Sequence, residues 1–170
     1  MAIIKSVRGI SPVFGEDCFI ADNATIVGEV QIGKQCSIWF NAVVRGDVNS
    51  ITIGDYTNIQ DGAVIHCTYQ KAKTIIGNQV SVGHNAIVHG CTVEDNALIG
   101  MGAIVMDHAQ IGAYAIVAAG SVVLEGTRVE PETIYAGVPA KKVKDVDETM
   151  KSSMYTTAQN YLKYSRWFKE

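Results

Sequence analysis

Residues 93–129 read VEDNALIGMGAIVMDHAQIGAYAIVAAGSVVLEGTRV, with a branched aliphatic residue at every sixth position. These positions are Val93, Ile99, Val105, Ile111, Val117, Val123 and Val129. A period of six matches neither the 3.6-residue period of a helix nor the two-residue alternation of a simple strand. It is typical of hexapeptide solenoids, in which six residues form one short strand and a bend, and three such units close a triangular coil.

The same period extends backwards through most of the chain. Aliphatic residues keep the six-residue spacing in three further runs, which are Ile20, Ile26, Ile32, Ile38, Val44; Ile53, Ile59, Ile65; and Ile76, Val82, Val88. Residues 1–140 are therefore predicted to form an all-β solenoid, a parallel β-helix with Ile and Val packed inside. An antiparallel sandwich of short strands is the alternative, and it would leave the in-phase positions as coincidence.

The period slips at three places near a group of histidines. Intervals of nine, eleven and five residues follow Val44, Ile65 and Val88 in place of six. If each interval still forms one side of the triangle, the first two carry surface excursions and the third a deletion. Loops that interrupt a regular scaffold commonly carry function. The slips therefore support a functional site beside the histidines.

The last part of the chain changes its pattern after Pro139, where the six-residue period stops. Residues 141–170 are predicted to be a helical segment that packs on the β-helix, because Met150, Met154 and Ala158 begin an apolar stripe at helical spacing. Asp147 precedes this stripe and is a suitable N-cap.

Composition limits the class of protein. The chain has 170 residues, of which 48% are hydrophobic and 18% charged, so it can bury the core of one domain. A net charge of −3 argues against a nucleic-acid partner. No apolar run approaches the roughly 20 residues that a membrane span needs, and the first residues lack a signal-peptide core. These features predict a cytoplasmic location, with four reduced cysteines.

Three of the four histidines, His66, His84 and His89, fall within 24 residues. Neutral imidazole is the commonest protein ligand for zinc, so a metal site is the leading hypothesis, although a lone histidine is more often a hydrogen-bonded bystander. Counting sides of the triangle places His66 and His89 in one column with Arg45. The same count places His84 in a second column with Asp61.

The two columns lie on different parts of a rigid prism, so one chain cannot easily bring all three histidines together. Two chains can, if the first column of one subunit faces the second column of its neighbour. Such a contact joins two different surfaces and must close into a ring, for which a trimer suits a triangular prism. Three histidines with an open position form a catalytic zinc site, and Arg45 would then face a neighbour's Asp61.

Several short motifs carry a family resemblance. They are Arg45-Gly46-Asp47, Asn58-Ile59-Gln60-Asp61-Gly62, His66, Gly83-His84, His89-Gly90-Cys91, Gly100-Met101-Gly102 and Gly137-Val138-Pro139-Ala140-Lys141. With them the chain, from about Ile10 to its end, resembles the γ-class carbonic anhydrase-like proteins of the hexapeptide-repeat superfamily. The resemblance implies that the β-helix is left-handed, an exception to the usual right-handed crossover.

The resemblance also implies a function and a set of roles. His66 and His89 of one subunit and His84 of the next would bind Zn²⁺, or natively Fe²⁺ or Co²⁺, in a homotrimer that hydrates CO₂ to bicarbonate. Gln60 would hydrogen-bond the hydroxide that the metal carries, with Asn58 nearby. Tyr161 would reach the metal pocket, for which ordinary packing is the alternative. The residues that join neighbouring subunits would be Arg45, Asp47 and Asp61, and Arg45 would also guide bicarbonate.

Two departures from the family pattern affect turnover. Well-characterised members carry proton-transferring glutamates where this chain has Val48 and the loop Cys67–Thr74, which contains no carboxylate. The chain matches the branch that lacks the acidic loop, so CO₂ hydration is expected to be slow. Three alternatives remain: a hexapeptide-type acyltransferase, a thioesterase that uses the same metal, and a non-catalytic trimeric module stabilised by metal.

Overall fold

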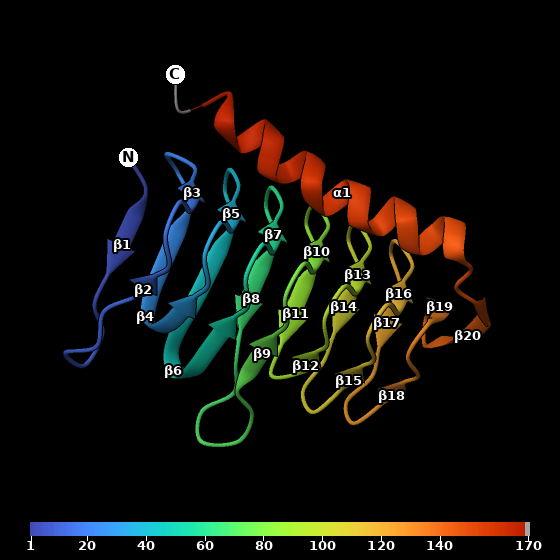
Figure 1. The fold of residues 1–170 in the computed structure, drawn as a ribbon. Coiled ribbons are helices and arrows are strands. Elements are labelled where there is room, and N and C mark those ends of the chain that lie inside the picture. The colour runs from blue at the N-terminus through green and yellow to red at the C-terminus, as the bar shows by residue number, and fades with distance from the viewer. Residues whose placement is uncertain (169–170) are drawn as a thin grey trace.

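A computed structural model describes residues 1–168 and shows a parallel β-solenoid with one α-helix along its side (Figure 1). The prediction of an all-β solenoid followed by a helix is confirmed, in the form expected of a left-handed β-helix of hexapeptide repeats. Its eight-stranded sheet comprises β3 (Phe19–Ile20), β5 (Ser37–Ile38), β7 (Asn58–Ile59), β10 (Ser81–Val82), β13 (Leu98–Ile99), β16 (Ile116–Val117), β19 (Thr133–Gly137) and β20 (Ala140–Asp145).

The second sheet has twelve strands and bends around a corner of the prism. It comprises β1 (Ile3–Lys5), β2 (Val13–Phe14), β4 (Thr25–Ile32), β6 (Val43–Ile53), β8 (Val64–His66), β9 (Thr74–Ile76), β11 (Ile87–His89), β12 (Thr92–Val93), β14 (Ile104–Val105), β15 (Gln110–Ile111), β17 (Val122–Val123) and β18 (Arg128–Val129). The long strands β4 and β6 pair with strands on both sides of the corner. The solenoid therefore has three faces.

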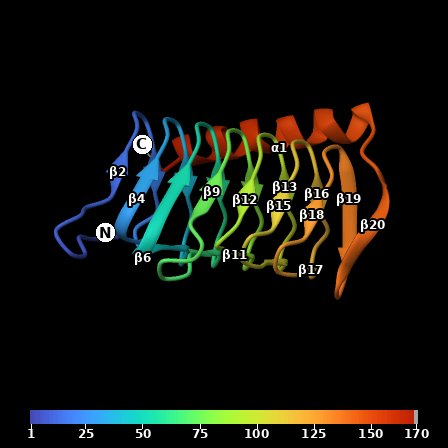
Figure 2. The same ribbon diagram turned by 90° about the horizontal axis from the view of Figure 1, so that it is seen from below.

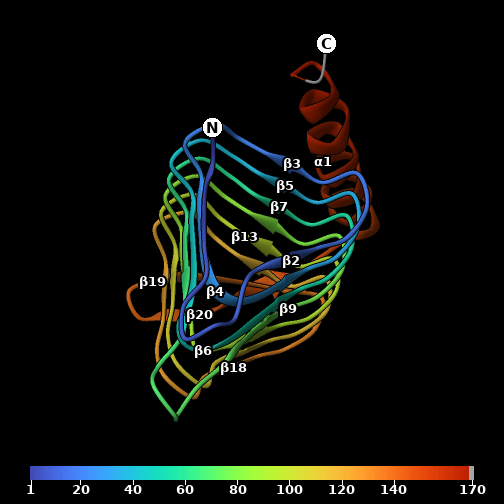
Figure 3. The same ribbon diagram turned by 90° about the vertical axis from the view of Figure 1, so that its left-hand side faces the viewer.

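We number the faces by their strands. Face 1 is the eight-stranded sheet, face 2 carries β8, β11, β14 and β17, and face 3 carries β9, β12, β15 and β18. Seen from below, the strands of successive coils lie side by side along one axis (Figure 2), and seen from the end the coils superimpose (Figure 3).

The six-residue period fills the interior. In face 1, Ile38, Ile59, Val82 and Ile99 pair in register on successive coils, and each is fully buried. Burying an aliphatic side chain of this size contributes about 1.5–3 kcal/mol. Because each coil packs mainly on its two neighbours, the stability of the solenoid is distributed along its axis.

Two irregularities occur where the sequence period slips. Gly46 pairs with Gly28 and Ile51 pairs with Val30, so β6 has a bulge between Gly46 and Ile51. The loop between β8 and β9 protrudes from the prism (Figure 1) and is closed by a bridge between Thr68 and Ala72. Both lie beside the histidine-bearing ends of β8 and β11.

The end of the solenoid corrects the expectation that residues 141–170 are a helical segment. Ala140–Asp145 instead forms β20, which returns antiparallel to β19 and covers the edge of face 1. Exposed charged side chains on this last strand discourage pairing with further strands, and they are Lys141, Lys142 and Lys144. The helix α1 spans Glu148–Arg166, and its N-cap is Asp147, which accepts a 2.8 Å hydrogen bond from the Met150 amide.

Helix α1 runs back along face 1 from the last coil toward the first (Figures 1 and 3). Met154 and Ala158 are buried on its inner side. Tyr161 packs edge-on against Trp39 with ring centroids 5.4 Å apart. None of the helical structure in residues 1–168 is long and apolar enough to cross a membrane.

Candidate metal centre

His66 and His89 form a pair at the ends of β8 and β11. The two residues are register partners on successive coils, as the side count predicted. Their rings approach so that His66 Nδ1 lies 3.0 Å from His89 Nε2. One nitrogen of each ring therefore faces the other at hydrogen-bond distance on the edge of face 2.

A carboxylate stands behind each ring of this pair. His66 Nε2 lies 3.0 Å from Asp47 Oδ1, and His89 Nδ1 lies 2.6 Å from an Asp107 oxygen. When each ring donates its N–H to its carboxylate, the two facing nitrogens carry lone pairs, which repel unless a cation lies between them. Tetrahedral zinc with Zn–N distances near 2.0–2.1 Å places its ligand nitrogens about 3.3 Å apart. The pair fits two corners of such a centre.

The charges around the pair favour this arrangement. Burial lowers the pKa of the His66 imidazole, which favours the neutral form that binds metals. Burial alone would raise the pKa of Asp47 and of Asp107. Hydrogen bonds from His66 and Arg45 nevertheless hold the Asp47 pKa below its usual value, and bonds from Thr68 and His89 do the same for the Asp107 pKa.

His84 belongs to a separate cluster in the turn after β10. Its Nδ1 lies 2.9 Å from Asp61 Oδ2, and its Nε2 lies 3.4 Å from the Tyr161 hydroxyl. Tyr161 thus reaches His84 from α1, and its burial raises the pKa of its hydroxyl. Like His66 and His89, His84 has one ring nitrogen in contact with a carboxylate, and its other ring nitrogen faces a different group.

Gln60 and Asn58 lie beside this second cluster and are both buried. Gln60 Nε2 donates to Asn58 Oδ1 over 3.0 Å, and Asn58 Nδ2 donates to the Ser81 hydroxyl over 2.8 Å. Gln60, His84 and Tyr161 line a cavity of about 370 Å³. The rest of its lining is mostly apolar and includes Leu98, Met101 and Ile116.

The chain does not join the two clusters by itself. Within the described residues, no three His, Cys, Asp or Glu side chains form a group able to hold a metal ion. Arg45 forms an ion pair with Asp47 of the same chain, and Asp61 contacts His84. The contact between Arg45 and a neighbour's Asp61 stays a prediction.

The two cysteines near the histidines are packed as small apolar residues. Cys67 and Cys91 are both 1% exposed. Burial raises the pKa of the Cys91 thiol to about 12. Cys67 donates to the Asn49 carbonyl over 3.1 Å, and burial also raises the pKa of its thiol. Both side chains therefore pack as small, buried residues.

Two residues of this centre are not among those predicted from the sequence. Asp107 contacts His89, and Thr68 donates a hydrogen bond to Asp107 from the protruding loop. The side count points to Met106 on the next coil, because Met106 directly follows Val105, the register partner of Val88, whereas Asp107 lies one place further along. Nothing in the spacing of the sequence indicates Thr68.

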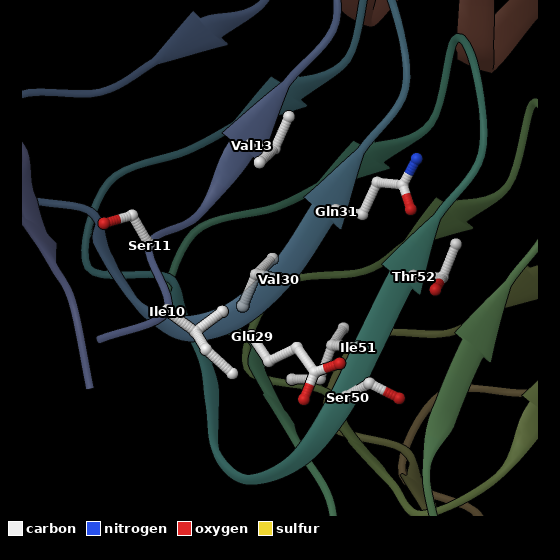
Figure 4. Close-up of a pocket in the computed structure, with 9 residues that line it drawn as sticks. All are labelled: Ile10, Ser11, Val13, Glu29, Val30, Gln31, Ser50, Ile51 and Thr52. Atoms are coloured by element: carbon white, nitrogen blue, oxygen red, sulfur yellow. The ribbon is translucent and has the colours of Figure 1, made fainter. Parts of the chain in front are cut away.

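A second cavity, of about 470 Å³, lies at the N-terminal end on face 3 (Figure 4). Its lining includes Ile10, Gln31, Ser50 and Thr52, and Glu29 is the one charged side chain among its lining residues. These side chains include no histidine or cysteine. This cavity therefore lacks the imidazole and thiolate ligands that zinc most often takes.

Comparisons with known proteins identify the family and the fold of the chain. A family model described as bacterial transferase hexapeptide (six repeats) matches residues 11–46 and 90–125. The chain is 41% identical over 167 residues to the carbonic anhydrase of Geobacillus kaustophilus, covering 98% of this chain and 91% of that protein. It is also 41% identical over 164 residues to mitochondrial γ carbonic anhydrase 2 of Arabidopsis thaliana, covering 94% of this chain.

The chain belongs to the γ-class carbonic anhydrase-like family. This γ-class chain spans 59% of the length of the Arabidopsis relative. A crystal structure of a hexapeptide transferase family protein from Anaplasma phagocytophilum superimposes with a TM-score of 0.91 at 41% identity. That match covers 98% of each chain. The γ-class family and the hexapeptide transferases thus share this scaffold.

Proposed function

We propose that the chain is the subunit of a trimeric, metal-dependent carbonic anhydrase that hydrates CO₂ to bicarbonate. One observation carries the proposal: His66 Nδ1 and His89 Nε2 face each other across 3.0 Å with a carboxylate behind each ring. The names of the family relatives support the same activity. Zn²⁺ suits a set of imidazole ligands, and Fe²⁺ and Co²⁺ are the alternatives.

The third ligand would be His84 of a neighbouring subunit. The outward side chains of face 2 form a half-buried apolar column of Val43, Val64, Ile87, Ile104 and Val122. Most of the matching column of face 3 is polar and contains Gln31, Thr52, Thr92, Gln110 and Arg128. An apolar surface beside His66 and His89 supports a protein contact there. Contact between face 2 and a neighbour's face 1 edge would close a ring of three.

Each residue then has a definite task. A divalent metal held by the three imidazoles would lower the pKa of a coordinated water toward neutrality. Because Gln60 Nε2 donates to Asn58, the Gln60 amide oxygen is left as an acceptor that would hold and orient an O–H group at the centre. The apolar walls around Leu98 would admit CO₂, and Arg45 would attract the bicarbonate product. With no carboxylate in Cys67–Thr74, proton release would depend on buffer.

Elemental analysis and CO₂ hydration, measured on one sample purified without oxygen or chelator, test this function. We expect about one metal ion for each chain and a hydration rate that rises with the concentration of a proton-accepting buffer. Stripping the metal should abolish the activity, and adding Zn²⁺ or Co²⁺ should restore it. A protein that binds no metal would contradict the proposal. Bound metal without hydration would favour the non-catalytic module.

The trimer has its own prediction. Changing Ile104 to Asp should dissociate the assembly, because an ionised carboxylate in the apolar column of face 2 would be buried without a partner. The matched control is Gln110→Asp, on the polar column of face 3. Sedimentation should show monomers for the first variant and trimers for the second. Equal sedimentation of both would place the subunit contact elsewhere.

Acyl transfer is the second candidate. The cavity of about 370 Å³ beside His84 lies within the size range of small-molecule pockets and has room for an acyl group. The similarity to a hexapeptide transferase family protein points the same way. Consumption of acetyl-CoA by the metal-free protein would support this candidate, and hydrolysis by the metal-loaded protein alone would support a thioesterase.

A further inference from the structure

We infer that Asp107 is a positioning residue of the metal centre, which fixes the His89 ring and connects it to the loop between β8 and β9. Its carboxylate accepts from His89 Nδ1 over 2.6 Å with one oxygen and from the Thr68 hydroxyl with the other. Both oxygens are thus used, one on the candidate ligand and one on the loop. This inference rests on the proposed metal centre.

The absence of a side chain at Gly90 leaves room for the Asp107 carboxylate. A side chain at Gly90 would place its Cβ 2.3 Å from an Asp107 oxygen and 2.7 Å from Asp107 Cγ. Gly90 also has a positive φ of 56°, which glycine adopts without strain. Gly90 directly follows the candidate ligand His89, and because it has no side chain it leaves room for Asp107. The Gly90 amide donates to the His66 carbonyl, which links the same turn to the other histidine.

The side chains around the two histidines form one continuous network of contacts across the edge of face 2. Arg45 pairs with Asp47, Asp47 contacts His66, and the His66 ring faces the His89 ring. His89 then contacts Asp107, and Thr68 in the loop between β8 and β9 donates a hydrogen bond to Asp107. The family resemblance implies that Asp47 would lie at the subunit contact, whereas Asp107 lies on the next coil and holds its ring from the opposite side.

A carboxylate in this position does two things to a ligand histidine. It fixes the tautomer, so that Nε2 keeps its lone pair toward His66, and it makes the ring a stronger base toward a cation. Loss of such a partner typically weakens metal binding 10–100-fold. The Thr68 hydroxyl fixes the carboxylate in turn, so the loop would influence metal affinity through Asp107.

Zinc affinity, measured by competition with a chromogenic chelator, tests the inference. We expect Asp107→Ala to weaken Zn²⁺ binding by about 10–100-fold. Asp107→Asn should weaken it less, because its amide oxygen still accepts the His89 N–H, and Thr68→Val should cause the smallest loss. The visible spectrum of Co²⁺ bound to Asp107→Ala should also differ from that of the wild type, because the His89 ring is free to rotate.

Asp95→Ala is the matched control. Asp95 accepts from the Asn78 amide over 2.8 Å in a turn away from the histidines, so its loss should affect stability and leave Zn²⁺ affinity unchanged. Unaltered affinity in Asp107→Ala, or an equal loss in Asp95→Ala, would overturn the inference. A wild-type protein that binds no Zn²⁺ would overturn the proposed function as well, whereas normal wild-type binding with an insensitive Asp107 removes only this step.

Discussion

Replacing His84 with alanine is expected to abolish stoichiometric metal binding while the β-helix stays folded. His84 lies in a half-exposed turn and its contacts are with Asp61 and Tyr161, so the interior columns do not depend on it. Without it, His66 and His89 alone would leave the metal with two protein ligands, too few for a stable zinc site. Elemental analysis gives the metal content, and circular dichroism reports the fold.

A mixing experiment separates a shared site from a site within one chain. The His84→Ala chain keeps His66 and His89, and a His66→Ala chain keeps His84. In a mixed trimer, one of the three subunit contacts combines the intact histidines of both chains. Random mixing of equal amounts should therefore restore about one quarter of the wild-type metal.

The mixing experiment distinguishes a site shared between subunits from a site within one chain. Each variant alone should bind almost no metal, and so should a mixture of the two folded proteins before their subunits exchange. Recovery that requires refolding the two chains together would establish that neighbours share the site. Refolded mixtures that stay empty, or a His84→Ala protein that keeps its metal, would contradict the placement of His84 in a neighbour's site.

Replacing Ile111 with alanine should destabilise the solenoid by about 2–5 kcal/mol, because it leaves a cavity among closely packed aliphatic side chains. Ile111 is fully buried, and its register partners are Val93 and Val129 on the coils before and after. Its neighbour Gln110 points outward on the same strand and is exposed. Gln110→Ala should change the free energy of unfolding by less than about 0.5 kcal/mol.

Urea unfolding at a fixed protein concentration measures both variants. The two substitutions lie on the same strand of face 3, and neither residue belongs to the two histidine clusters, so metal content should stay at the wild-type level in both. Similar midpoints for Ile111→Ala and Gln110→Ala would mean that the alternation of inward and outward residues on β15 is not what stabilises this coil.

The interior could be predicted from the sequence because a six-residue period leaves little freedom. Each inward residue pairs with an inward residue of the next coil, so one column such as Ile59, Val82 and Ile99 fixes the register of the whole face. The end of the solenoid could not be predicted in the same way. Residues 141–145 have no six-residue period, and they form a strand because β19 offers an unpaired edge.

The residues of the candidate site also differ in whether the sequence period predicts their contacts. The stacking of His66 on His89 follows from counting sides, whereas the hydrogen bond of Asp107 to His89 depends on side-chain conformations in a turn. The link from Thr68 depends on the shape of a loop, which has no period at all. What the neighbour contributes, which metal is native, and the cytoplasmic location stay predictions.

The length of helix α1 matches the length of the solenoid along its axis. Its first turn is held at the last coils by the ion pair of Lys151 with Glu132, and Phe168, just beyond its end, packs on Phe19 in the first coil of face 1. Nineteen helical residues span about 28 Å, and six strand spacings span about 29 Å. Each coil gained by duplication would therefore require about three more helical residues to keep both of these end contacts.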